Sequence, residues 1–152
     1  MAGQYDQAIE RARKAIEMEP TPIAHWVLGL AFEQKGMYKE AVAEFRKAVS
    51  LGGGPAGQAL LGHGYAVSGQ RSEARKILAQ LMALSKRTFV SGYGIATIYA
   101  GMGEKDQAFG WLEKAYEQRA ENLGWLKIDP RFESLRDDPR FQSLLLRMNF
   151  PE

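Results

Sequence analysis

The sequence contains no cysteine and only two histidines, His25 and His63, among its 152 residues. Without thiolates the chain has no disulfides, no cysteine nucleophile and no Cys-ligated zinc or iron–sulfur site. Two imidazoles are too few for an ordinary metal centre, so we expect no cofactor. The charge has no dominant sign either, since the chain has 20 basic and 18 acidic residues. This balance argues against the basic field that drives nucleic-acid binding.

Long hydrophobic runs are also missing. The chain starts with Met-Ala-Gly-Gln-Tyr-Asp, which is not the basic and then apolar order of a secretory signal. Its longest uncharged stretches, residues 48–70 and 88–103, are interrupted by glycine and polar residues and are too polar to cross lipid. We therefore expect a cytoplasmic protein that has no membrane contact.

A repeat with a period of 33 or 34 residues is the main pattern in the sequence. An alanine recurs at this spacing, and a glycine lies five residues before each alanine. The alanines are Ala8, Ala41, Ala74 and Ala108, and the glycines are Gly3, Gly36, Gly69 and Gly103. A pattern of Leu-Gly-x-x-aromatic keeps the same register in Leu28-Gly29 with Phe32, Leu61-Gly62 with Tyr65, and Ile95-Ala96 with Tyr99. A fixed period of this length predicts a stack of similar structural units.

Each recurring position has a role in a pair of antiparallel helices. Small residues, such as Gly29 on a first helix and Ala41 on a second, allow the two helix axes to approach closely. A glycine at the end of the first helix, such as Gly36, adopts a left-handed conformation without a Cβ penalty and lets the chain reverse. Leu28 and Phe32 share one helical stripe, as residues four apart should, and we expect them in the core.

These residues resemble the tetratricopeptide repeat, whose unit of about 34 residues is a helix, a turn and a second helix. The resemblance covers a half repeat over residues 4–20 and full repeats over residues 22–52, 55–86 and 89–119. It implies an all-α fold, a right-handed α-solenoid that forms a single domain over residues 1–152.

The chain begins halfway through a repeat. Its first segment has an apolar helix face, and no preceding helix is present to cover all of it. This face consists of Tyr5, Ala8, Ile9, Ala12 and Ile16. Two explanations remain open: further repeats and domains lie upstream in a longer protein, or two copies associate through residues 4–18.

A different duplication follows the last repeat. Asp129-Pro-Arg-Phe-Glu-Ser-Leu recurs nine residues later as Asp138-Pro-Arg-Phe-Gln-Ser-Leu. In each copy the aspartate can cap a short helix, and proline suits its first turn. These helices are predicted to form a C-terminal helical cap over residues 121–150. We expect its arginines, Arg131, Arg136, Arg140 and Arg147, to face water, and Trp111 and Trp125 to lie at the junction with the last repeat. The tail resembles those that close tetratricopeptide arrays in bacterial multidomain signalling proteins.

No set of residues has the spacing of a catalytic site. Ser68 and Ser91 lie near glycines but lack the strand and the Gly-x-Ser-x-Gly elbow of a serine hydrolase. The glycine-rich stretches lack the Lys-Ser/Thr that ends a phosphate-binding loop. We therefore expect a protein that is not an enzyme.

The family resemblance also implies a binding surface, because its first helices line the concave side of the stack. The implied peptide-binding residues are Ile23, Trp26, Leu30, Glu33, Gln34, His63, Val67, Tyr93 and Thr97. The matching positions carry no Lys or Arg, whereas family members that grip acidic C-terminal peptides use a clamp of Lys, Asn and Arg. This favours a neutral groove for an apolar or aromatic peptide or helix. The small residues in it could instead serve only to tighten the stack.

The sequence thus predicts a non-catalytic protein–protein interaction module that binds a peptide or helical segment of a protein partner and forms part of a larger protein. The alternative is a structural segment of a bacterial signalling or regulatory protein that forms homo-oligomers through residues 4–18. Neither hypothesis involves nucleic acid, a membrane or a cofactor.

Overall fold

The structure, a computed structural model, describes residues 2–149, and its regular elements there are all helices. In chain order they are α1 (Ala2–Met18), α2 (Pro22–Gln34), α3 (Tyr38–Ser50), α4 (Gly54–Val67), α5 (Arg71–Ser85), α6 (Gly92–Gly101), α7 (Lys105–Glu117), the 3-10 helices η1 (Glu121–Trp125) and η2 (Pro130–Leu135), and α8 (Pro139–Arg147). The predicted all-α fold is confirmed. Residue 150 of the predicted cap, and residues 1, 151 and 152 of the predicted domain, lie outside the described residues.

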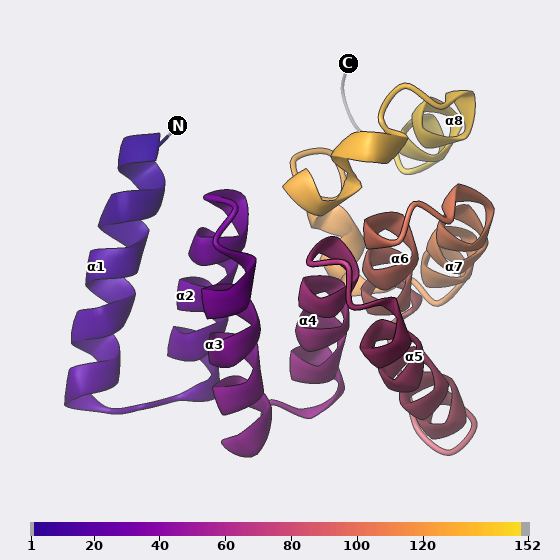
Figure 1. Cartoon of the computed structure of the whole chain (residues 1–152). Helices are drawn as coiled ribbons and strands as arrows, with labels where there is room; N and C mark the ends of the chain where they lie inside the picture. The colour runs from indigo at the N-terminus through magenta and orange to yellow at the C-terminus, as the bar shows by residue number, and fades with distance from the viewer. Residues whose placement is uncertain (1, 150–152) are drawn as a thin grey trace.

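The helices form a row of antiparallel hairpins (Figure 1). The hairpins are α2 with α3, α4 with α5, and α6 with α7, and α1 lies against α2. Helix α4 also packs on α3 before it and on α6 after it, so neighbouring hairpins are in direct contact. This is the helical solenoid that the sequence predicts. The handedness of the stack and the limits of its repeats stay predictions.

The turn inside each hairpin follows the predicted glycine. Gly36, Gly69 and Gly103 have positive φ angles of 76°, 83° and 77°, each just after a first helix. The residue after each glycine then donates its N–H to a carbonyl in the last turn of that helix: Met37 to Phe32 at 2.9 Å, Gln70 to Tyr65 at 2.9 Å and Glu104 to Tyr99 at 3.0 Å. Gly3, the first glycine of the series, lies inside α1 instead.

The small residues lie where helices meet, as predicted. A Cβ atom on Gly29 would lie 2.4 Å from the ring of Phe45, and one on Gly62 would lie 2.5 Å from the side chain of Ile98. On the second helices, Ala41, Ala74 and Ala108 are completely buried. The Leu-Gly-x-x-aromatic pattern is also mostly buried: this holds for Leu28, Leu61, Ile95, Phe32 and Tyr65, while Tyr99 is half-buried.

Helix α1 is better covered than its sequence suggests. Ile9 and Ala12 are buried in the core, and Ala8 and Ile16 pack against it. Helix α2 thus covers part of this apolar face, while Tyr5, Ala8 and Ile16 are half-buried. That upstream repeats or a second copy of the chain cover the remainder stays a prediction. Polar and charged side chains dominate the opposite, exposed side of α1, and one of them, Asp6, forms an ion pair with Lys35 at the end of α2.

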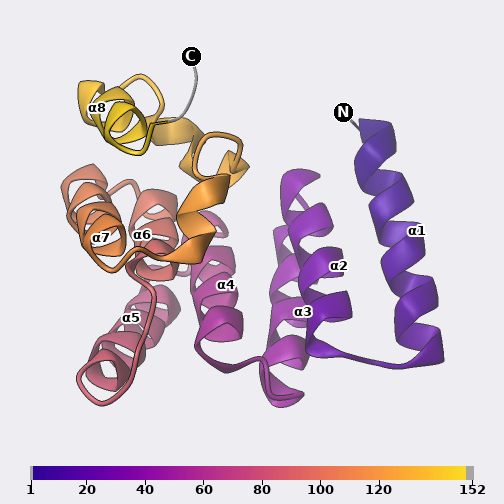
Figure 2. The ribbon, with the colours of Figure 1, turned by 180° about the vertical axis from the view of Figure 1, so that it is seen from behind.

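The C-terminal segment, defined as residues 121–149, packs on the last hairpin. As predicted, Asp129 and Asp138 cap two short helices by accepting hydrogen bonds from the N–H groups of Arg131 and Arg140, at 3.0 and 2.9 Å. The first of these helices is a 3-10 helix. It lies against α6, whereas α8 contacts α7 (Figure 2). Buried apolar side chains of the segment join the core around α6 and α7: Leu123, Leu126, Phe132, Leu135, Phe141 and Leu144.

The arginines of this segment divide into two pairs. Arg140 and Arg147 are exposed, as predicted. For Arg131 and Arg136 the prediction is wrong, since only 17% and 26% of their side chains are exposed. Arg131 pairs with Asp129, and Arg136 donates hydrogen bonds to the carbonyls of Lys127 and Asp129. These two side chains hold the chain between η1 and η2 in place.

Among residues 2–149, no helix combines the length and the hydrophobicity that a bilayer crossing requires.

The close approach of helices can be tested with two glycine variants. Gly29→Ala should lower the free energy of unfolding by about 1–2 kcal/mol, because overlap with the buried Phe45 ring outweighs the better helix propensity of alanine. Gly110→Ala on α7 is the matched control, since its Cβ would meet nothing within 4 Å. It should raise the stability by about 0.5–1 kcal/mol. Urea unfolding followed by circular dichroism measures both, and equal stabilisation by the two variants would contradict close packing at Gly29.

Candidate functional site

A pocket of about 520 Å³ lies between the first helices of the hairpins and the C-terminal segment. We call it the aromatic pocket, after the aromatic side chains on its walls. The lining side chains that matter for recognition are Trp26, Leu30, Ala59, Phe89, Tyr93 and Trp125. They come from α2, α4, the loop before α6, α6 itself and η1, so the pocket depends on several hairpins and on the C-terminal segment together.

Two of these aromatic side chains remain in water although they are large. Phe89 is 65% exposed and Trp125 is 63% exposed. Phe89 belongs to the loop between α5 and α6, and Trp125 ends η1, so neither occupies a repeat position. Exposed aromatic side chains around one hollow are typical of surfaces that bind another molecule.

Trp26 forms the opposite wall and is held by packing. Its indole nitrogen lies close to α4, where a Cβ on Gly53 or Gly57 would be 3.3 Å away from it. This nitrogen is buried and has no hydrogen-bond partner among the described residues. The absence of side chains at Gly53 and Gly57 therefore lets the indole approach the start of α4 closely.

Tyr93 anchors the C-terminal segment to α6. Its hydroxyl donates a hydrogen bond of 2.6 Å to Asp129, and its ring meets that of Phe132 edge to face at 5.1 Å between centroids. Burial and the negative charge of Asp129 both raise the pKa of Tyr93 well above its ordinary value, so the phenol stays a neutral donor. With 2% exposure, Tyr93 contributes only a small edge of the pocket.

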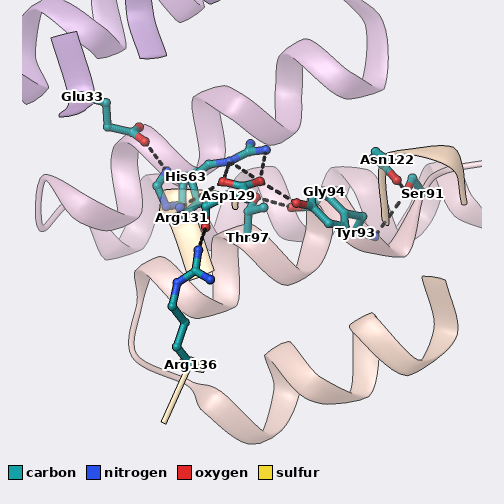
Figure 3. A network of polar contacts seen from close by, with 10 residues as sticks. All are labelled: Glu33, His63, Ser91, Tyr93, Gly94, Thr97, Asn122, Asp129, Arg131 and Arg136. Atoms are coloured by element: carbon teal, nitrogen blue, oxygen red, sulfur yellow. Dashed lines mark hydrogen bonds and ion pairs between the residues drawn. The ribbon is translucent and has the colours of Figure 1, made fainter. Parts of the chain in front are cut away.

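Asp129 and Arg131 form a two-pronged ion pair beside this tyrosine (Figure 3). The guanidinium Nε lies 3.0 Å from Oδ1, and Nη2 lies 2.8 Å from Oδ2. Burial raises the pKa of Asp129, but the hydrogen bonds and charge of Arg131, together with the Tyr93 hydroxyl, outweigh it and hold the pKa below its ordinary value. Arg131 thus brings a cation to the concave side that the first helices lack.

Glu33 and His63 pair with each other across α2 and α4. The Nδ1 atom of His63 lies 2.8 Å from a carboxylate oxygen of Glu33, and both side chains are at least 95% buried. The atoms are within ion-pair distance, yet their alignment is not that of a hydrogen bond. Figure 3 shows the pair near Arg131. Both side chains thus offer almost no surface to a peptide, and their role in binding stays a prediction.

His25 is buried in the same way. Its Nδ1 atom lies 2.6 Å from a carboxylate oxygen of Glu44 on α3. Each histidine therefore has a carboxylate neighbour, a pairing that no motif in the sequence predicts. Within residues 2–149, no group of three or more candidate ligands is placed to hold a metal ion.

The predicted site residues therefore separate in space. Trp26, Leu30 and Tyr93 come together at the aromatic pocket. Thr97 is fully buried and donates a hydrogen bond of 2.6 Å to the Gly94 carbonyl, so it does not line the pocket, and its contact with a partner stays a prediction. The remaining predicted residues do not line this pocket: Ile23 is exposed, and Gln34 and Val67 are half-buried.

Phe89, Asn122 and Arg131 line the pocket although the sequence does not predict them there. Trp125 also lines it, whereas we expected it at the junction between the last repeat and the C-terminal segment. Phe89 could have been noticed as a large apolar residue in a loop between repeats. No pattern in the sequence brings residues 122–131 to the concave side. Trp111, the other tryptophan expected at the junction, is half-buried on α7. It packs against the buried apolar residues of the earlier hairpins and against those around α6, α7 and the C-terminal segment.

A comparison with protein families gives one match. The tetratricopeptide repeat model matches residues 2–57, which include α1, the hairpin of α2 and α3 and the start of α4. No curated protein matches the chain.

The ion pair of Asp129 predicts how stability depends on pH. A carboxyl group whose pKa is lower in the folded than in the unfolded chain stabilises the fold above about pH 4, and this contribution is lost as the pH falls further. Asp129→Asn should therefore be about 2 kcal/mol less stable than the parent chain at pH 7. The difference should shrink as the pH falls from about 5 to about 3.

Urea unfolding at a series of pH values measures both effects. Asp137→Asn is the matched control, because Asp137 is exposed and makes no ion pair among the described residues. A constant difference between the parent chain and Asp129→Asn at every pH would show that the charge of Asp129 does not stabilise the fold.

Proposed function

Because residues 2–57 belong to the tetratricopeptide repeat family and the later hairpins have the same helix–turn–helix build, we propose that the chain is a non-catalytic interaction module that binds a peptide or helix of a partner in the aromatic pocket. Tetratricopeptide repeats generally mediate protein–protein interactions. The observation that carries the proposal is the pocket itself, which is lined by the exposed side chains of Phe89 and Trp125 together with Trp26.

The pocket has the physical features of an anchor site. Burying one large exposed side chain such as Phe89 or Trp125 contributes about 1.5–3 kcal/mol. Tryptophan is also among the residues that most often dominate binding energy at interfaces. Trp26 is already held against α4, so this wall needs little ordering on binding, and most of the entropy cost falls on the partner segment.

The polar groups at the pocket support binding better than catalysis. Its ionisable side chains are Tyr93 and Arg131. Tyr93 donates a hydrogen bond to Asp129, and Arg131 forms an ion pair with it. Tyr93 stays protonated at neutral pH because its pKa is raised, and Arg131 remains a cation. Neither side chain can accept a proton from a bound substrate, and general base catalysis requires a group that can.

Self-association through residues 4–18 has no comparable observation behind it. The apolar side of α1 is engaged with α2, so two copies would have to meet through the exposed polar side. Such a surface lacks the apolar centre on which stable interfaces depend.

The proposal can be tested with peptides selected from a random library on the immobilised chain. Trp125→Ala should weaken the binding of the selected peptides by at least about tenfold, because it removes an exposed anchor of the pocket. Leu146→Ala is the matched control, since Leu146 is equally exposed at 63% but lies on α8, outside the pocket. Calorimetric titration measures the affinities, and circular dichroism shows that both variants are folded.

The same titration can contradict the proposal. If Trp125→Ala and Leu146→Ala bind the selected peptides equally well, the aromatic pocket is not the binding site. Trp26→Ala should weaken binding further, although part of its effect arises from lost packing on α4. Tyr93 is unsuitable for this test, because its hydroxyl holds the C-terminal segment through Asp129.

A further inference from the structure

A second hollow of about 420 Å³ adjoins the aromatic pocket. Both hollows are lined by Phe89, Ser91 and Asn122, so these three residues lie at the border of the two. The other lining residues of the second hollow are residues 119–121, from the connection between α7 and η1. Its charged side chains, Arg119 and Glu121, have opposite signs, so the second hollow favours neither an acidic nor a basic group.

The side chain of Asn122 is oriented by the residue that caps α6. The Ser91 hydroxyl accepts a hydrogen bond from the N–H of Tyr93 at 3.2 Å and so caps this helix. It donates its own hydrogen to Oδ1 of Asn122 at 3.1 Å (Figure 3). This arrangement uses the oxygen end of the Asn122 amide and leaves its two N–H donors for another acceptor.

A second amide fixes the backbone on both sides of Ser91. Gln118, at the end of α7, accepts a hydrogen bond from the N–H of Gly92 at 3.0 Å through Oε1. Its Nε2 atom donates to the carbonyl of Val90 at 3.4 Å. Both ends of the Gln118 amide are therefore in use within the chain, whereas the Asn122 amide is used at one end alone. Ser91 thus holds Asn122 from a backbone that is itself held.

The Asn122 nitrogen is an uncharged donor without a partner at the border of the two hollows. It forms no hydrogen bond within residues 2–149 and, unlike the indole nitrogen of Trp26, it is not among the buried atoms that lack one. The other uncharged donors of the aromatic pocket are already engaged. The Tyr93 hydroxyl donates to Asp129, and the Ser91 hydroxyl donates to Asn122. A molecule that reaches from one hollow into the other would therefore meet the free N–H groups of Asn122.

The acceptor that suits this position is a backbone carbonyl of an extended segment. The aromatic pocket, at about 520 Å³, accommodates one or two large side chains and is too small for a whole helix. The carbonyls inside a helix already accept hydrogen bonds from the N–H groups of the same helix. An extended segment leaves its carbonyls free, and its side chains two residues apart project from the same face. Such side chains can enter adjacent hollows while the backbone crosses the border between them.

We propose that Asn122 is the polar anchor of the site: its amide donates a hydrogen bond to a backbone carbonyl of an extended partner segment. One large apolar side chain of this segment enters the aromatic pocket, and the side chain two residues away enters the second hollow. This inference rests on the proposed function and adds the conformation of the partner and a binding residue in η1, outside the repeats.

The peptides selected from the random library on the full chain provide the probe. In the peptide that binds most tightly, each backbone amide is replaced in turn by an ester, whose carbonyl is a weaker hydrogen-bond acceptor. One replacement close to the apolar anchor should weaken binding by about three- to tenfold, the range expected for one neutral hydrogen bond. Calorimetric titration measures the affinities. If every ester binds as well as the parent peptide, the inference is wrong.

Asn122→Asp separates donation to the partner from a role in holding Ser91. Aspartate keeps an oxygen for the Ser91 hydroxyl but has no N–H donor. The variant should therefore bind the parent peptide about three- to tenfold more weakly, and the sensitive ester should cost it no further affinity. Asn149→Asp is the matched control, since Asn149 is exposed and lines neither hollow, and it should leave the affinity unchanged.

Asn122→Ala should show the same loss of the ester effect, and circular dichroism shows whether each variant is folded. An ester that costs both Asn122 variants as much affinity as it costs the parent chain would show that the carbonyl is not bound by Asn122. Parent affinity in Asn122→Asp would show that Asn122 acts only by holding Ser91. Either result overturns the inference.

Nuclear magnetic resonance separates failure of this inference from failure of the proposed function. Asn122 and Asn149 are the asparagines of the chain, so ¹⁵N-asparagine labelling gives one side-chain amide for the site and one as an internal reference. On binding, the Asn122 amide and the indole signals of Trp26 and Trp125 should shift. If the two indoles shift and Asn122 does not, the inference is wrong and the proposed function stands. If neither indole shifts, or if no peptide is selected, the proposed function is wrong and the inference fails with it.

Discussion

The stack depends on helix contacts that leave no space for a methyl group. Gly29 faces the ring of Phe45, and Gly62 faces the side chains of Ile77 and Ile98, at distances that a Cβ could not share. Close packing of this kind fixes both the separation and the tilt of neighbouring helices. Because the contact recurs along the chain, the first helices α2, α4 and α6 come to lie on a common side, and the aromatic pocket forms between them and the C-terminal segment.

The C-terminal segment covers α6 with a small set of directed contacts. In the first copy of its duplicated motif, Asp129 caps η2 and Arg131 pairs with it, while Phe132 packs on Tyr93. In the second copy, Asp138 caps α8 and Arg140 lies 4.3 Å from the centre of the Phe109 ring on α7. The two copies thus attach to the two helices of the last hairpin. Their apolar side chains are buried in one cluster with those of α6 and α7.

Much of the fold could be predicted because its determinants are local and periodic. The positive φ of Gly36 follows from the need to reverse the chain after a helix, and the burial of Ala41 follows from its repeat position. The site was less predictable. Arg131 and Arg140 occupy identical positions in the duplicated motif, yet their side chains are 17% and 47% exposed. Only tertiary placement distinguishes them, since η2 packs against α6 and α8 packs against α7.

The contacts of individual side chains were the least predictable part of the site. The repeat pattern cannot show that Glu33 and His63 lie next to each other between α2 and α4, or that Thr97 donates a hydrogen bond to the Gly94 carbonyl. Burial favours the pairing of Glu33 with His63, because an isolated buried carboxylate is costly. Tyr93 is likewise committed to Asp129.

The aromatic pocket is consequently specified by residues that differ from repeat to repeat or lie outside the repeats. Trp26 shares its register with Ala59 and Tyr93 but differs from both, Phe89 lies in a loop, and Trp125 belongs to the C-terminal segment. Periodic residues are under a common packing constraint and can vary little without disturbing their neighbours. Residues outside the period have no such constraint, so they can differ freely in size and charge. Selectivity for a partner should therefore reside in these non-repeating residues, with the regular hairpins serving to hold them at fixed positions.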